Sequence, residues 1–193
     1  MPNLAAKEAS LTRYVALLRA VNVAGHARLR MAALTPLFAA AGAREARAFA
    51  HAGNVLFSAP RHAVRSLIAN AQTAIADVCG ERPSIMLRTA AELTTLVAAE
   101  PFAHCEAGAD DKLYVAFLAR KPRRRPRLPA TEPAEGLTAF ALRGREALLV
   151  SRRKPSGFYG FPNAFVEALF GVSATTRNWS TVTKLTKLLE GIT

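Results

Sequence analysis

Three polar side chains, Arg19, Asn22 and His26, stand in or directly after an apolar run, LLRAVNVAGHARLRMAAL from residue 17 to residue 34. Burying a guanidinium without a partner is costly, so Arg19 needs a carboxylate, backbone carbonyls or a bound anion. Its two interpretations are therefore an internal salt bridge or carbonyl clamp, and an anion ligand. Asn22 either caps a strand end or binds a ligand. His26 is either an exposed loop residue or an acid–base group.

A second polar cluster, ATTRNWST from residue 174 to residue 181, precedes a segment with helical apolar spacing. A helix start offers unpaired amide donors and the positive end of the helix dipole. With the side chains of Thr176, Arg177 and Asn178, these groups are the components of an anion site. In the alternative interpretation Asn178 is only an N-cap and Trp179 only packs.

Asn54 follows Gly53 between two strand-like segments, and such a pair is typical of a tight turn. The same amide can instead join a binding site. We expect Arg19, Asn22, Asn54 and the 177–179 segment to line one shared concavity.

The excess positive charge is concentrated in one region. The chain has a formal net charge of +12, and residues 112–157 carry 12 basic and 3 acidic side chains. The segment 120–127, RKPRRRPR, is the densest part, and Arg123, Arg124 and Arg125 are candidates for contact with a polyanion such as nucleic acid. No aromatic residue stands between these arginines, so this segment predicts weak, nonspecific contact without base stacking. In the alternative interpretation the segment 120–127 is only a solvated linker.

The chain contains none of the common catalytic or metal-binding motifs. It has no Gly-rich phosphate loop, nucleophile elbow or HExxH pattern, and its four histidines are scattered without metal-ligand spacing. We therefore expect no metal and no cofactor. An enzyme remains an alternative, with Arg19 and Arg177 as charge stabilisers and His26 as acid or base.

The composition is that of a folded chain in a reducing compartment. Of 193 residues, 51% are hydrophobic, which excludes an intrinsically disordered chain. No apolar run approaches the ~18 residues that span a bilayer. Cys79 and Cys105 have no paired-ligand spacing, and residues 1–10 lack the apolar segment of a secretory signal. We expect a cytoplasmic protein with a flexible tail at 1–10 and no membrane partner, and the oligomeric state stays open.

The first half predicts a ferredoxin-like lobe at residues 11–100. A strand at 13–21 precedes a short helix ending at Gly42, and two strands follow around the turn at 52–54. The clearest helix is 61–79, and SIMLR is the next strand, after which Thr89 and Glu92 form a capping box. The order βαββαβ is the split βαβ arrangement.

The second half, residues 111–193, predicts another α+β lobe that partly repeats the first. KLYVAFLAR is a strand, the proline-rich basic segment at 120–129 is an exposed connection, and TAFALRG and REALLVS form a hairpin around Gly144. FPNAFVEALFG and NWSTVTKLTKLLEG read as C-terminal helices.

Three segments of the chain resemble a bacterial family known as domain of unknown function 1697. They are YVALLRAVNVAGHARLRMAAL, HAGNVLF and SATTRNWSTVTKL. The matching positions are Arg19, Asn22, Gly25, His26, Gly53, Asn54, Thr176, Arg177, Asn178, Trp179 and Thr181. The chain departs from the family pattern at Ala20, Ala24, Ala27 and Ala52. The resemblance implies an α+β fold built from ferredoxin-like halves, and it implies no particular activity.

The sequence as a whole favours a binding protein for an anionic or phosphate-bearing ligand. The expected ligand-binding residues are Arg19, Asn22, His26, Asn54, Thr176, Arg177, Asn178 and Trp179. The alternatives are an enzyme acting on a small phosphate-bearing molecule and a nonspecific nucleic-acid-binding protein.

Overall fold

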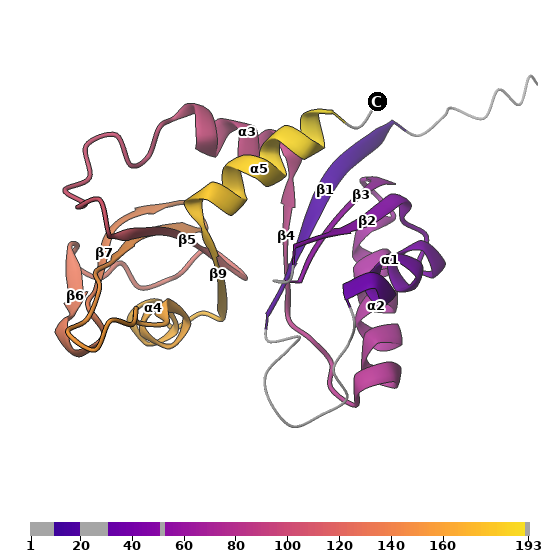
Figure 1. Ribbon diagram of the computed structural model, residues 1–193. Helices are drawn as coiled ribbons and strands as arrows, with labels where there is room; N and C mark the ends of the chain where they lie inside the picture. The colour runs from indigo at the N-terminus through magenta and orange to yellow at the C-terminus, as the bar shows by residue number, and fades with distance from the viewer. Residues whose placement is uncertain (1–9, 20–30, 51–52, 192–193) are drawn as a thin grey trace, which may run out of the picture.

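The fold is α+β, with two antiparallel sheets and five α-helices in the part of the chain that the structure describes (Figure 1). This computed structural model describes residues 10–19, 31–50 and 53–191. The expected tail at 1–10 therefore lies almost wholly outside the described residues.

The first sheet is built from the first half of the chain in the strand order β2-β3-β1-β4, and all neighbouring strands are antiparallel. Its strands are β1 (Leu11–Leu18), β2 (Arg44–Phe49), β3 (Asn54–Pro60) and β4 (Ile85–Thr89). Helices α1 (Met31–Ala40) and α2 (Val64–Cys79) cover one face, where Phe38 and Phe57 pack against each other in a buried cluster. Successive side chains of β1 and β3 point to opposite faces of the sheet. Because both strands are largely apolar, buried side chains pack on each face.

The second sheet has the order β6-β7-β8-β5-β9, again with antiparallel neighbours. Its strands are β5 (Lys112–Leu118), β6 (Ala130–Glu132), β7 (Leu137–Arg143), β8 (Glu146–Ser151) and β9 (Ala174–Asn178), with the short 3-10 helix η1 (Pro133–Glu135) after β6. Helix α4 (Pro162–Phe170) covers one face through Val166 and Phe170.

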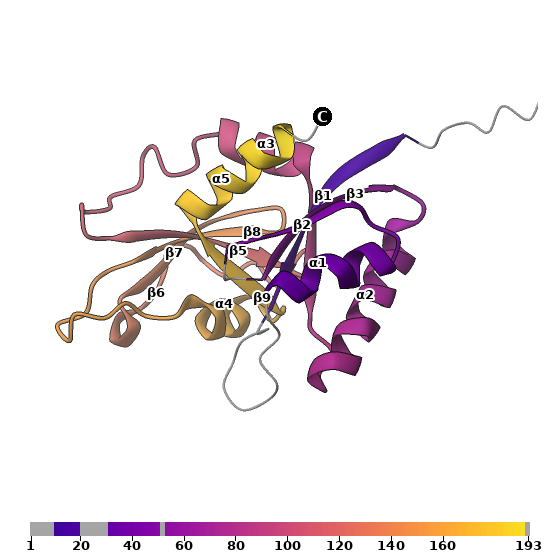
Figure 2. The same ribbon diagram turned by 45° about the vertical axis from the view of Figure 1, so that its right-hand side comes forward.

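Helices α3 (Ala90–Ala98) and α5 (Trp179–Glu190) lie next to each other over both sheets and join them (Figure 2). Their apolar faces share one buried cluster with side chains of both sheets, among them Leu17 of β1 and Phe117 of β5. The two halves of the chain thus have a common core in addition to their separate ones. Since each helix directly follows the strand β4 or β9, the ends of these strands fix where the helices begin.

Most predicted elements are confirmed, including the capping box, in which Thr89 accepts a hydrogen bond from the Glu92 amide and Glu92 accepts one from the Thr89 amide. The segment 119–129 has no strand or helix, as its prolines predict, and Arg123, Arg124 and Arg125 are exposed. The strand at 174–178 was not predicted: these residues form β9 and pair with β5, directly before helix α5. The β-branched pair Thr175-Thr176 favours such a strand.

The described residues contain no helix long and apolar enough to cross a membrane. Cys79 and Cys105 are both free thiols.

Candidate functional site

Arg177 is buried between the two sheets and donates every N–H of its guanidinium to an oxygen of this chain. Its Nε donates to Asn54 Oδ1 at 2.6 Å, and its Nη1 donates to Thr175 Oγ1 and the Thr176 carbonyl. Its Nη2 donates to the carbonyls of Leu18 and Gly53, at 3.0 and 3.3 Å. Burial lowers the pKa of Arg177 to about 10, so the side chain is still charged at neutral pH. These contacts are a carbonyl clamp from β9 onto the ends of β1 and β3.

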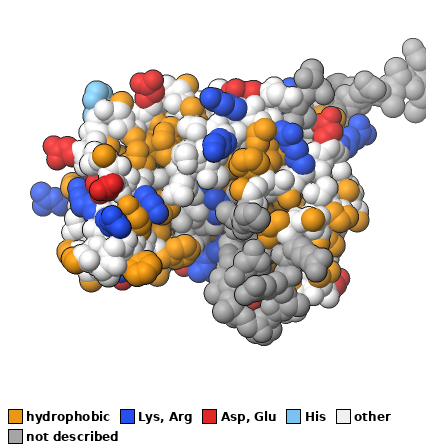
Figure 3. Space-filling view, viewed as in Figure 1, with side chains coloured by type: hydrophobic (Ala, Val, Ile, Leu, Met, Phe, Trp, Pro, Cys, Tyr) orange, Lys and Arg blue, Asp and Glu red, His pale blue; other side chains and the backbone are white. Residues whose placement is uncertain are grey.

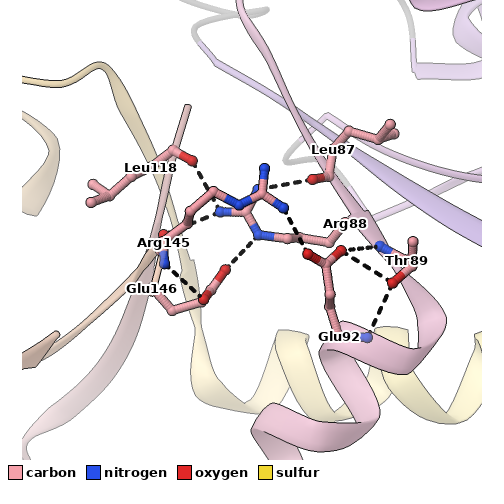
Figure 4. A network of polar contacts seen from close by, with 7 residues as sticks. All are labelled: Leu87, Arg88, Thr89, Glu92, Leu118, Arg145 and Glu146. Carbon is pink, nitrogen blue, oxygen red and sulfur yellow. Dashed lines mark hydrogen bonds and ion pairs between the residues drawn. The ribbon is translucent and has the colours of Figure 1, made fainter. Parts of the chain in front are cut away.

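Arg88 forms a second clamp in the opposite direction (Figure 4). It leaves β4 and donates Nη2 to the carbonyls of Leu118 and Arg145, at 3.0 and 3.1 Å. Its Nε forms an ion pair with Glu146, and its guanidinium lies 5.4 Å from the centre of the Phe117 ring. Burial lowers the pKa of Arg88, and the neighbouring Glu146 carboxylate opposes this shift.

The two clamps occupy equivalent positions in the two sheets. Arg88 is paired with Val15 across β4 and β1, and Arg177 is paired with Val115 across β9 and β5. Each arginine also bonds the carbonyl of its own preceding residue, Leu87 or Thr176.

The acceptors of the two clamps are equivalent as well. Arg88 Nη2 reaches the last residue of β5 and the residue before β8. Arg177 Nη2 reaches the last residue of β1 and the residue before β3. Arg88 and Glu146 were not predicted as functional residues, although Arg88 directly precedes a helix cap, as Arg177 does.

The clamps differ in charge. The first residue of β8 is Glu146, a carboxylate, whereas the first residue of β3 is Asn54, a neutral amide. Asn54 is fully buried, accepts from Arg177 and donates its Nδ2 to the Phe49 carbonyl. The Arg88 clamp is therefore neutral overall, and the Arg177 clamp holds a buried positive charge surrounded by neutral oxygens.

The predicted convergence of polar residues is present in part. Asn54 and Arg177 are in direct contact, and Arg19 directly follows the Leu18 carbonyl that Arg177 binds. Arg19 forms an ion pair with Glu167 of α4 at 2.8 Å, which is one of the two interpretations of this residue. Its Nε is buried without a hydrogen-bond partner in the described part of the chain.

The other expected ligand-binding residues have separate surroundings or are not described. Thr176 donates its hydroxyl to Asn163 Oδ1 at 2.9 Å. Asn178 is the N-cap of α5 without a side-chain hydrogen bond to the helix, and Trp179 packs on Phe102 with ring centres 5.1 Å apart. Asn22 and His26 lie outside the described residues.

Cavities border the β7–β8 hairpin on both sides. A cavity of about 410 Å³ lies between α3 and the hairpin, and it adjoins another of about 390 Å³ that also includes Arg143. A third, of about 290 Å³, separates the hairpin from the connection at 119–129, and both Lys121 and Arg125 line it. Among these three cavities, the third, which we call the connection cavity, has two cationic side chains, Lys121 and Arg125, in its lining.

The cations of the connection cavity have no acidic partner within the described residues. The four ion pairs among the described residues are formed by other cations, namely Arg19, Arg88, Arg145 and Lys154. No Asp or Glu occurs between Lys112 and Thr131 in the sequence, so the connection supplies no carboxylate of its own. Within residues 10–19, 31–50 and 53–191 there is also no group of three side chains suited to hold a metal ion.

Comparisons with known proteins identify a family and a fold. Residues 11–147 match the family described as "Protein of unknown function (DUF1697)". The solved structure of the conserved bacterial protein SP0830 from Streptococcus pneumoniae is similar, with a TM-score of 0.65 and 16% sequence identity over 93% of this chain and 99% of that chain. No curated protein matches the sequence.

We expect the substitution Arg177→Met to lower the free energy of unfolding by about 3 kcal/mol, because several buried oxygens lose their donor. Arg88→Met removes a donor from equivalent carbonyls and should cost a similar amount. Arg19→Met is the control, since its ion pair is partly exposed and contributes at most about 1 kcal/mol. Urea unfolding measures all three. A loss for Arg177→Met no larger than that for Arg19→Met would contradict the clamp.

Glu92 should contribute a pH-dependent part of the stability. Burial raises the pKa of its carboxyl, but hydrogen bonds from Thr89 and Arg145 outweigh this, so the pKa lies below its ordinary value. The carboxylate therefore stabilises the fold fully above its ordinary pKa, and this stabilisation is lost as the pH falls through the lowered value.

We expect Glu92→Gln to be less stable than the parent at neutral pH and to approach it on acidification. Unfolding followed at several pH values measures the difference, and Glu81→Gln controls for the loss of an exposed carboxylate. A difference between Glu92→Gln and the parent that grows as the pH falls would contradict the direction of the pKa shift.

Proposed function

This chain belongs to the DUF1697 family of proteins of unknown function, and on that premise we propose that it is a binding protein for an anionic or phosphate-bearing ligand. The connection cavity supports this proposal. Lys121 and Arg125 line it without an ion pair to a described carboxylate, and Leu128 and Leu142 add apolar surface. A cavity of about 290 Å³ is of the size that holds a small molecule. Two cations beside apolar surface suit an anion with an apolar part.

The proposal assigns the ligand to the connection cavity because Arg177, Asn54 and Arg19, which the sequence predicts as ligand-binding residues, have internal partners. Arg177 has no free N–H, and Asn54 uses both its oxygen and its nitrogen inside the protein. Arg19 is already neutralised by Glu167. A ligand-binding role for Asn22, His26 and Asn178 stays a prediction.

Binding is favoured over catalysis by the chemistry of the lining. The side chains around the connection cavity are basic, proline, leucine and glycine residues, and no carboxylate, histidine, serine or cysteine is among those described. General acid–base catalysis uses such a group or a lysine within hydrogen-bond reach of the substrate. Of the described lining residues only Lys121 is of this kind, and no second proton-transferring side chain lines the cavity with it.

A second candidate function is nonspecific contact with a polyanion. Arg123 and Arg124 are exposed beside the cavity and have no ion pair in the described chain. A row of exposed cations attracts phosphates without reading a sequence.

We also propose that the chain is organised in two lobes, as expected from the sequence. Residues 11–100 and 111–193 form two lobes, supported by the fact that each sheet takes its strands from one of them. The order βαββαβ and the strand order β2-β3-β1-β4 support a ferredoxin-like first lobe. The two free cysteines support a cytoplasmic location.

We expect inorganic pyrophosphate to raise the melting temperature of the protein more than sodium chloride of equal ionic strength, because a ligand bound only to the folded state stabilises it. Lys121→Ala/Arg125→Ala should lose most of this protection. Arg65→Ala/Lys184→Ala is the matched control, since it removes the same two charges from exposed positions on α2 and α5. Equal protection of both variants would refute the cavity as the anion site.

The polyanion function predicts a different result. Long-chain polyphosphate should bind with an affinity that falls steeply with salt, and Arg123→Ser/Arg124→Ser should reduce both the affinity and the salt dependence. The same variant should leave pyrophosphate protection unchanged, because neither residue lines the cavity. Titrations at two salt concentrations measure both effects. Polyphosphate binding that is unaffected by the substitution would contradict a role for the exposed arginines.

A further inference from the structure

Two aromatic rings are exposed on the segment 152–161, which connects β8 to α4 and which we call the aromatic loop. The side chains of Phe158 and Phe161 are 73% and 72% exposed, whereas the next most exposed large hydrophobic residue in the described chain, Val78, is 52% exposed. Leaving a phenylalanine in water forfeits about 1.5–3 kcal/mol of burial. Two such residues close together in the sequence indicate a surface that a partner covers.

The backbone of the aromatic loop is held in one conformation by contacts within the loop. The Lys154 amide donates to the Phe158 carbonyl and the Gly157 amide donates to the Lys154 carbonyl, both at 2.8 Å. Arg153 Nε donates to the Gly157 carbonyl at 3.1 Å.

Contacts with the rest of the protein anchor the same loop. The Tyr159 hydroxyl donates to the Asp110 carbonyl. Gly160 lies so close to the backbone and side chain of Glu135 that a Cβ would not fit there. The rings of Phe158 and Phe161 are therefore presented by a fixed scaffold, which reduces the entropy that binding would cost.

Cationic side chains belong to the same loop as the rings. Arg152 and Arg153 are exposed and form no ion pair in the described chain, and each donates one hydrogen bond, to Thr138 Oγ1 and to the Gly157 carbonyl. Lys154 is paired with Glu135. Lys112 lies over the Tyr159 ring, with Nζ 3.9 Å from the ring centre. In Figure 3 blue Lys and Arg side chains and orange hydrophobic side chains lie next to one another on the left of the molecule, on the part that the second sheet forms.

Because one fixed loop carries two exposed rings and two exposed arginines that form no ion pair in the described chain, we propose that the aromatic loop binds single-stranded nucleic acid. The rings of Phe158 and Phe161 stack on bases, and Arg152 and Arg153 contact the phosphates that flank them. Aromatic rings next to cations are the usual means by which proteins bind single strands without sequence preference. A duplex offers the rings no free base face, so single strands are bound in preference.

The charges around the loop favour a nucleic acid over an anionic membrane. Asp110 and Glu135 lie beside the aromatic loop, since the Asp110 carbonyl accepts from the Tyr159 hydroxyl and the Glu135 carboxylate pairs with Lys154. A flat anionic bilayer would bring its charge against these carboxylates as well as against the arginines. A single strand that stacks on two rings contacts a narrow path and avoids them.

The test is the binding of a fluorescein-labelled 12-nucleotide thymidine strand, followed by fluorescence anisotropy, with full-length protein. Phe158→Ala/Phe161→Ala should weaken binding at least tenfold, because stacking on each ring contributes about 1–3 kcal/mol per base. Val78→Ala is the matched control, since it truncates an exposed apolar side chain on α2 and should leave the affinity unchanged. Phe158→Tyr/Phe161→Tyr should bind like the parent because a ring is kept.

Two further measurements assign the contact to this loop. Arg152→Ala/Arg153→Ala should make the fall of log affinity with log salt concentration shallower, by the amount expected for the loss of about two phosphate contacts. The Lys121→Ala/Arg125→Ala variant should bind the strand as the parent does. The parent should also bind the single strand more tightly than a duplex of the same length.

Three results would overturn the proposal. They are equal affinity of the parent and the Phe158→Ala/Phe161→Ala variant for the strand, a preference for the duplex, and loss of strand binding in the Lys121→Ala/Arg125→Ala variant alone. Phosphatidylserine vesicles that bind through the two phenylalanines while the strand does not bind would assign the loop to a membrane surface. Thermal unfolding confirms that the variants are folded, as expected for exposed side chains.

Discussion

Two buried guanidinium groups hold the two sheets together, and the rest of the architecture depends on them. Arg177 reaches from the second sheet to the carbonyls at the end of β1, and Arg88 reaches from the first sheet to the carbonyls at the end of β5. Burying a charge is unfavourable unless its hydrogen bonds are made, and both side chains meet that condition by using the other sheet's strand ends. Helices α3 and α5 begin directly after the strands that carry these arginines, so the clamps also fix where the shared core between the sheets is placed.

The internal use of Arg177 changes which cations are open to a ligand. A positively charged residue in an apolar strand suggests an anion partner, but carbonyls and an amide can satisfy the same donors. On the connection and on the aromatic loop, Lys121, Arg125, Arg152 and Arg153 are exposed and form no ion pair in the described chain. The functions that we propose therefore use segments between the strands, while Arg177 and Asn54 bond other parts of the fold.

Local patterns predicted the elements well, because amphipathic spacing, a capping box and turn residues act within a few residues of one another. They identified α2 from its buried Leu67, Ala71 and Ile75, and α3 from Thr89 and Glu92. Strand β9 was missed because a five-residue polar strand is stabilised by its pairing with β5, about sixty residues away in sequence. The partner of Arg177 could not be predicted for the same reason, since Asn54 lies 123 residues away and no local pattern connects them.

The reciprocity of the clamps resembles the two-fold symmetry of a dimer interface. In a symmetric homodimer the same residue donates in both directions, because each partner presents an identical surface to the other. One half of this chain, paired with a copy of itself, would place its strand arginine on the partner's strand end in that manner. The chain thus has, within one polypeptide, a contact arrangement like that of a two-fold dimer. The carboxylate at Glu146 and the amide at Asn54 are a difference between the two clamps that identical subunits could not have.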